Sequence, residues 1–161
     1  MTTAIQRGDI VLFRRSPLNI LWSYLRFGLK YNHMAIAIGN GNLMDIVADN
    51  PPRVKRLESL DSKDVTVFRL LPARELPGSL DIEAIQKNYT LGKNRLIFPW
   101  IKYRGTNNIL CHEFVAQMYN IMADYEIGWV NVLDRLYKIA KNVDRAVQQG
   151  ECYIVYRKGS T

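Results

Sequence analysis

Cysteine, histidine and long apolar runs are all scarce in this sequence of 161 residues. Its two cysteines, Cys111 and Cys152, are too few for a disulfide scaffold, and lone cysteines usually stay reduced in cytosolic proteins. The longest apolar stretch, residues 18–29, is interrupted by polar and charged side chains and is too short to span a bilayer. No apolar run follows the N-terminus, so we expect no signal peptide and a chain made as a soluble, cytoplasmic protein.

No repeat or low-complexity segment divides the chain, and its length suits a single domain over residues 1–161. The 22 basic residues outnumber the 15 acidic ones, and the resulting net charge of +7 favours an anionic partner such as a membrane surface. A basic cluster at Arg53, Lys55 and Arg56 could bind phosphates or could be a solvated face. No nucleic-acid-binding motif accompanies it, so we expect no specific nucleic acid partner.

Turn signals and apolar periodicity predict the order of strands and helices. Strands are expected over residues 9–13, 32–39, 43–48, 65–71 and 152–156. Helices are expected over residues 17–29, 81–91 and 129–147, and another begins near Cys111. Residues 49–54 are expected to be irregular and residues 93–110 to be mixed, with loop signals. Because strands and helices are segregated rather than alternating, the sequence predicts an α+β fold.

The expected helix over residues 17–29 is apolar on two faces and is flanked by basic residues. Such a helix suits burial between a sheet and a covering segment. It also suits insertion into an anionic membrane surface, which would bring a lipid acyl chain to the site. Either role would place the segment near His33, which follows it closely in the chain.

Cys111 is the candidate nucleophile. It follows a loop at residues 105–108 and opens an amphipathic helix, where free N–H groups and a positive partial charge lower a thiol pKa from its usual value of about 8.5. The same amides can hold the oxyanion that forms when a thiolate attacks an acyl group. The alternative is a small buried cysteine that packs one turn of the helix.

His33 is the candidate base, at the start of a strand with Ala35 on the same face. We expect the helix that carries Cys111 to pack on this alanine face; the alternative is a histidine bonded to a backbone carbonyl. Asp45 is the candidate third member. A three-residue loop at residues 39–41 would place Asp45 near His33, whereas a two-residue turn would point it away. An unpaired aspartate in an apolar strand is costly, which favours the first register.

Four short motifs occur in a characteristic order. They are Gly8-Asp9 before the first strand, His33 on a strand that runs into Gly39, Asp45 on the next strand, and Cys111 with Glu113 at a helix start. With the histidine ahead of the cysteine, residues 7–122 resemble the circularly permuted branch of the NlpC-type papain-like cysteine hydrolase family, which includes YiiX-like amidases and, remotely, lecithin retinol acyltransferase. The resemblance implies a permuted papain-like fold, in which an antiparallel sheet packs against the helix bearing the nucleophilic cysteine.

Three positions depart from the family pattern. The residue after the nucleophile is often serine in the family and is His112 here, and the third member is more often glutamate or histidine than Asp45. A tyrosine expected ahead of the cysteine has Tyr103 as its candidate match. Adjacent helix positions diverge by about 100°, so we predict that His112 does not share the face of Cys111 and that His112→Ser is tolerated.

The combined interpretation is a cysteine amidase, peptidase or acyltransferase with Cys111, His33 and Asp45 as a triad. The resemblance implies cell-wall peptides, or lipid amides and esters, as substrates. We expect no cofactor and no metal, because no tight ligand spacing supports the alternative of a zinc site at these residues and His112. The competing function is a non-catalytic binding module of the same fold that recognises an anionic ligand or a membrane surface.

Overall fold

The computed structural model describes residues 4–14, 31, 33–47, 51–60, 62, 64–71, 81–88, 90–91, 108–109, 111–123 and 129–159. The expected helix over residues 17–29, most of the segment 93–110 and the candidate Tyr103 lie outside the described residues.

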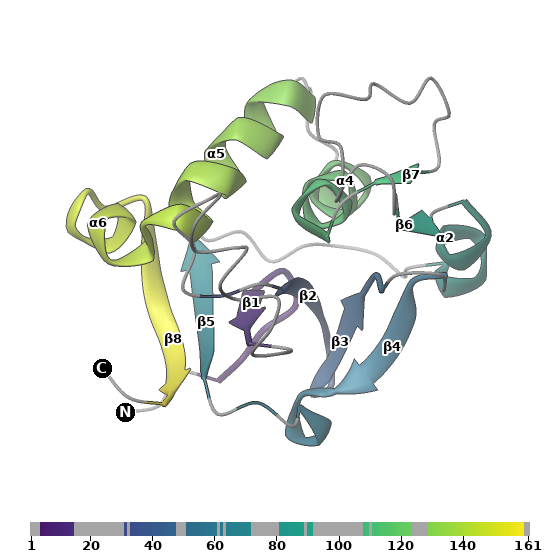
Figure 1. The fold of residues 1–161 in the computed structure, drawn as a ribbon, viewed down its shortest axis with the longest axis horizontal. Helices are drawn as coiled ribbons and strands as arrows, with labels where there is room; N and C mark the ends of the chain where they lie inside the picture. The colour runs from purple at the N-terminus through teal and green to yellow at the C-terminus, as the bar shows by residue number, and fades with distance from the viewer. Residues whose placement is uncertain are drawn as a thin grey trace.

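Six strands form one antiparallel sheet in the order β4-β3-β2-β1-β5-β8 (Figure 1). Their bounds are Ile10–Phe13 for β1, His33–Gly39 for β2, Asn42–Asp45 for β3, Arg53–Arg56 for β4, Val65–Leu70 for β5 and Cys152–Lys158 for β8. The two central strands, β2 and β1, are almost entirely buried. At the start of β2, His33 is paired with Phe13 of β1, and the pairing of β2 with β3 begins at Ile36.

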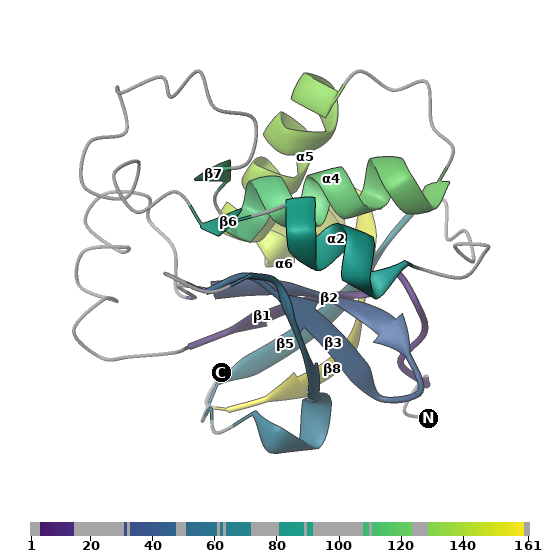
Figure 2. The ribbon, with the colours of Figure 1, turned by 90° about the vertical axis from the view of Figure 1, so that its right-hand side faces the viewer.

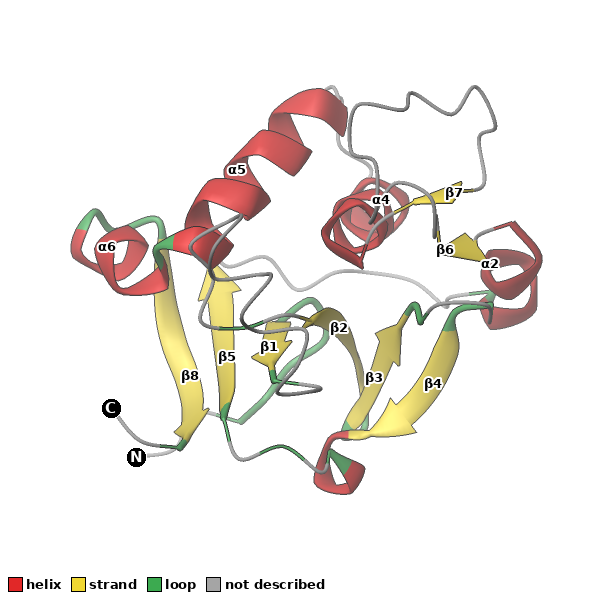
Figure 3. Cartoon of the chain, viewed as in Figure 1, coloured by secondary structure: helices red, strands yellow, loops and turns green. Residues whose placement is uncertain are grey.

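The described α-helices follow the first five strands of the sheet and precede β8 (Figure 3). The short 3-10 helix η1 (Leu57–Ser59) joins β4 to β5, and the α-helices are α2 (Ile82–Asn88), α4 (Cys111–Ala123), α5 (Trp129–Lys141) and α6 (Val143–Gln148). Two short strands between α2 and α4, β6 (Thr90–Leu91) and β7 (Asn108–Ile109), pair in parallel. The fold is mixed α+β, as predicted. None of the described helices has both the length and the apolar character needed to cross a membrane.

The two faces of the sheet have different coverings. On one face, Leu12 and Met34 belong to a buried cluster that includes Phe114 of α4 and residues of α5 and α6. On the other face, Val11 and Ala35 belong to a second cluster, which is covered by the N-terminal segment and by residues in and after η1. Figure 2 shows α2, α4 and α5 on one side of the sheet and η1 on the other. The α-helical layer therefore packs on the side of Met34.

The hairpin between β2 and β3 decides where Asp45 points. Asn40-Gly41 forms a two-residue turn in which both residues have positive φ. A β-bulge beside Gly39 then shifts the register, so that Ile36 faces Met44. The turn has two residues rather than three. Because of the bulge, however, the strands pair in the register that was predicted for a three-residue loop. The predicted register of Asp45 is therefore confirmed.

Residues 53–56 are expected to begin in an irregular connection, but they form the edge strand β4. The sequence Arg-Val-Lys-Arg carries a single apolar residue, Val54, which is exposed. An edge strand of this kind is held by its backbone pairing with β3 and by side-chain ion pairs, and neither produces an apolar alternation.

Two predicted helices are shorter than expected. The helix expected over residues 129–147 breaks at Asn142, which has non-helical φ and ψ of −143° and 55°. Ala140 and Val143 lie on either side of the break and are buried in the same cluster, so the apolar periodicity hides it. The helix expected over residues 81–91 ends at Asn88, because Thr90–Leu91 pairs with Asn108–Ile109.

Candidate active site

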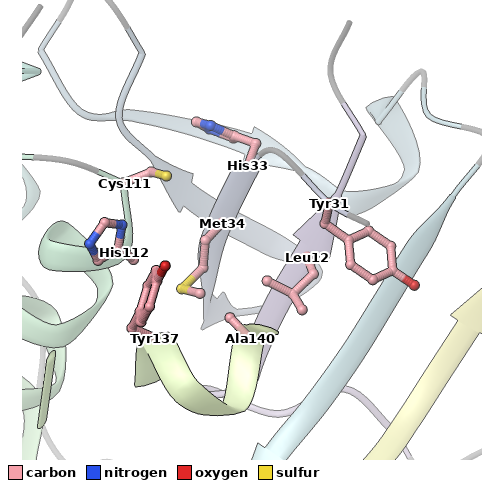
Figure 4. A pocket seen from close by; sticks show the side chains of 8 residues that line it. All are labelled: Leu12, Tyr31, His33, Met34, Cys111, His112, Tyr137 and Ala140. Carbon is pink, nitrogen blue, oxygen red and sulfur yellow. The ribbon is translucent and has the colours of Figure 1, made fainter. Parts of the chain in front are cut away.

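Cys111 is the first residue of α4, and its side chain is partly exposed. Phe114, Val115 and Met118 recur at helical spacing after it and are fully buried against the sheet. This packing fixes the N-terminus of α4, with its free N–H groups and positive dipole end, beside His33 (Figure 4).

His33 lies at the start of β2 with its imidazole edge-on to Phe13, its partner on β1; the ring centroids are 4.9 Å apart. The ring hydrogen-bonds with Asp45 through Nε2 (3.1 Å) and lines the same cavity as the Cys111 thiol. The expectation that the Cys111 helix packs on the alanine face of β2 is wrong, because α4 packs on the side of Met34. His33 nevertheless lines the same cavity as Cys111.

The Asp45 carboxylate is 2% exposed and is bonded by three side chains. Its Oδ2 lies 3.1 Å from His33 Nε2 and accepts from Lys55 Nζ at 3.0 Å, and its Oδ1 accepts from Arg53 Nε at 3.1 Å. Burial alone raises the pKa of Asp45, but the hydrogen bonds with His33 and Lys55 outweigh it and hold the pKa well below its usual range. Asp45 is therefore an anion in the folded protein at neutral pH.

The pKa values of the thiol and the imidazole favour an ion pair. Burial raises the pKa of Cys111, but hydrogen bonding with His112 and His33 outweighs it and lowers the pKa to about 5. Burial lowers the pKa of His33, but hydrogen bonds with Asp45 and Cys111 outweigh it and raise the pKa above 6.5. At pH values between the two, the thiol is ionised next to a histidine that keeps its proton.

His112 lines the same cavity as Cys111, and its interaction with the thiol lowers the pKa of Cys111. Its ring is tilted at 50° to the ring of Tyr137 on α5, with centroids 5.7 Å apart. The prediction that His112 does not share the face of Cys111 is wrong. The divergence of 100° describes where adjacent helical side chains begin, but long side chains bend back toward the helix N-terminus, where Cys111 lies.

A small cavity opens beside the thiol (Figure 4). Its lining consists of Leu12, Tyr31, His33, Met34, Cys111, His112, Tyr137 and Ala140. Tyr31 bonds to Thr66 through its hydroxyl group at 2.6 Å, and its ring points away from Cys111 in Figure 4. Sequence reasoning did not single out Tyr31, Tyr137 or Ala140, and no local motif marks them.

Two residues singled out from the sequence lie elsewhere. Cys152 of β8 is buried in the core, and burial raises its pKa to about 11. Asp9 is fully buried and binds Arg69 through both carboxylate oxygens. Neither residue lines the cavity beside Cys111.

Within the described ranges, no group of three or more histidine, cysteine, aspartate or glutamate side chains could hold a metal ion. The zinc alternative therefore has no ligand set in that part of the chain.

The chain matches no protein-family model, no curated protein and no solved structure.

Proposed function

We propose that the protein is a cysteine hydrolase or acyltransferase that acts on an amide or ester through Cys111, His33 and Asp45. The observation that carries this proposal is the line of contacts from the Cys111 thiol through the His33 imidazole to the ionised Asp45 carboxylate. A cysteine that only packs a core has a raised pKa, as Cys152 does. The lowered pKa of Cys111 and the partial exposure of this residue support a nucleophile instead.

In the proposed reaction, the Cys111 thiolate attacks the carbonyl carbon and forms a tetrahedral intermediate. The bond to the leaving amine or alcohol then breaks, His33 gives its proton to the leaving group, and a thioester remains on Cys111. Because Nε2 of His33 is bonded to Asp45, Nδ1 is the nitrogen that serves the thiol. His33 next takes a proton from water or from an acyl acceptor, which attacks the thioester and frees the thiolate.

Two parts of the structure would support the charges of this reaction. The free N–H groups at the start of α4 would bind the developing oxyanion. Asp45 would hold one imidazole tautomer and balance the charge of the imidazolium, as the third member of a triad does. Arg53 and Lys55 bond Asp45 and keep it ionised for this role.

The proposal extends to the fold. An antiparallel sheet, a histidine strand that precedes the cysteine in the chain, and a helix that opens with the cysteine all support a permuted, NlpC-type papain-like fold. In that family the corresponding reaction is the cleavage or transfer of an acyl group from a peptide or a lipid.

The test is to trap the acyl-enzyme. The protein is incubated with a peptidoglycan digest and, separately, with a total lipid extract, and is then quenched in acid for mass spectrometry. We expect an acyl adduct that maps to Cys111, is absent in Cys111→Ser and is reduced at least tenfold in His33→Ala. No adduct in either mixture, together with an ordinary alkylation rate for Cys111, would contradict the proposal and favour the non-catalytic binding module.

A further inference from the structure

The cavity beside Cys111 is polar on one side and apolar on the rest. The polar side carries the thiol and the imidazoles of His33 and His112. The apolar remainder includes Leu12 from β1, Met34 from β2 and Ala140 from α5, all of which are buried. In Figure 4 these side chains lie below Cys111 and His33, between the strands and α5. A group bonded to an attacked carbonyl would therefore meet hydrocarbon on entering the cavity.

The volume of the cavity limits what can enter. It measures about 40 Å³, whereas a cavity needs only about 10–15 Å³ to hold one water molecule. The space thus suits a small group of a few non-hydrogen atoms. Tyr137 bounds it on the side of α5, and Met34 lies between Tyr137 and the strands (Figure 4). A short acyl group therefore fits within this lining, whereas a longer chain would extend beyond it or displace one of these side chains.

We propose that this cavity is the acyl subsite and that it selects a short, unbranched or singly branched apolar acyl group of about four carbons. The inference rests on the proposed function, because the group in the cavity is the acyl part of the thioester on Cys111. The bond from the carbonyl carbon to Sγ forms as the bond to the leaving group breaks, and the leaving group departs away from the cavity. Acyl groups of this size occur in short-chain esters and in peptide residues with small apolar side chains.

The substrate series that tests the inference is p-nitrophenyl acetate, butyrate and octanoate, which share one leaving group. We expect kcat/KM for the butyrate to exceed that for the acetate by roughly tenfold, since two more methylene groups are buried. We expect kcat/KM for the octanoate to be at least tenfold lower than that for the butyrate, because the octanoyl chain is longer than the cavity. The rate of the Cys111→Ser protein is subtracted throughout.

Two variants change the cavity in opposite directions. Ala140→Leu fills it and should lower the ratio of butyrate to acetate toward one, whereas Lys141→Leu adds the same side chain at an exposed position and should keep the wild-type ratio. Tyr137→Ala enlarges the cavity and should raise kcat/KM for the octanoate relative to that for the butyrate. This variant provides the test if Ala140→Leu does not fold.

The outcomes separate the two proposals. If no ester acylates Cys111, the proposed function fails. If Cys111 is acylated but the octanoate is turned over as well as the butyrate, or the Ala140→Leu and Tyr137→Ala proteins keep the wild-type preference, the cavity is not the acyl subsite and only this inference fails.

Discussion

At Cys111, two physical effects act on the thiol in opposite directions. Burial disfavours the thiolate, whereas hydrogen bonds with His112 and His33 favour it. The hydrogen bonds prevail, and the pKa falls to about 5. At Cys152 no imidazole is present to oppose burial, and the pKa rises to about 11. The same residue type thus has opposite chemistry at two places in one chain.

The difference predicts how the two cysteines react with iodoacetamide. At pH 7 the thiolate fraction of Cys111 exceeds that of Cys152 by about four orders of magnitude. A thiolate with a lower pKa is also a weaker nucleophile, and this difference offsets roughly three of the four orders of magnitude. We expect Cys111 to be labelled at least tenfold faster, with a rate that rises with a midpoint near pH 5 and is level by pH 7. Peptide mapping after brief labelling at several pH values measures this, and a Cys111 rate still rising at pH 8 would contradict it.

His112 calls for a different prediction from the one that the sequence suggests. Because its hydrogen bond favours the thiolate, His112→Ser should raise the pKa of Cys111 and slow its alkylation at pH 5.5 by roughly tenfold. His112→Asn keeps an N–H donor and should retain part of the effect. The fold is checked by circular dichroism. Unchanged alkylation in His112→Ser would mean that His33 alone sets the thiol pKa.

At the scale of elements, β4 brings two positive charges to the carboxylate that His33 also bonds. Lys55 Nζ and His33 Nε2 share one oxygen of Asp45, and Arg53 bonds the other. The charged groups around His33 in the described structure are thus Asp45 on β3, Arg53 and Lys55 on β4, and Cys111 on α4, with His112 beside the thiol. Lys55 keeps Asp45 ionised but also repels a protonated His33.

Lys55→Met should therefore raise the pKa of His33 further above 6.5, because a like charge is removed while the bond to Asp45 stays. Proton NMR can follow this titration directly, since His33 and His112 are the only histidines and His112→Ser assigns the spectrum. Arg56→Met is the matched control, because it removes an exposed charge from the same strand. A fall in the His33 pKa in Lys55→Met would show that Lys55 mainly positions Asp45.

Sequence reasoning succeeded where an element has a buried apolar side. Burial enforces an alternation or a helical spacing of apolar residues. This pattern predicted the core strands, the start of α4 and the face of the sheet on which Asp45 lies. It failed where other forces act. The strand β4 is held by backbone pairing and ion pairs, and the break at Asn142 keeps the apolar side intact. The cavity joins residues from separate elements, and only the packed fold brings Tyr137 and Ala140 to Cys111.

For the whole molecule, a buried ion pair joins the N-terminal segment ahead of β1 to the neighbouring strand β5. Arg69 on β5 donates from Nε and Nη2 to the two oxygens of Asp9, at 2.6 and 2.9 Å. It also donates to the Tyr153 hydroxyl group on β8 and to the Ala4 carbonyl. Tyr119 of α4 donates to the carbonyl of Gly8, so the helix of Cys111 is tied to the same turn. The motif Gly8-Asp9 therefore has a structural role outside the candidate site.

This arrangement predicts a large loss of stability when one charge is removed alone. Asp9→Ala leaves Arg69, which is 8% exposed, as an uncompensated charge in the interior, and should lower the free energy of unfolding by about 3–5 kcal/mol. Asp9→Ala combined with Arg69→Met removes both charges, so its loss should be well below the sum of the two single losses. Tyr119→Phe removes one neutral hydrogen bond from the same turn and should cost only about 1 kcal/mol.

Urea unfolding followed by tryptophan fluorescence measures the four variants, with an unchanged m value as the sign that the denatured state is the same. Iodoacetamide labelling in the absence of urea should leave Cys111 of Asp9→Ala as reactive as in the wild type, because Asp9 lies outside the cavity. A loss under about 1 kcal/mol in Asp9→Ala would mean that water reaches Arg69 once the carboxylate is gone. Additive losses in the double variant would mean that the two charges stabilise the fold independently rather than as a pair.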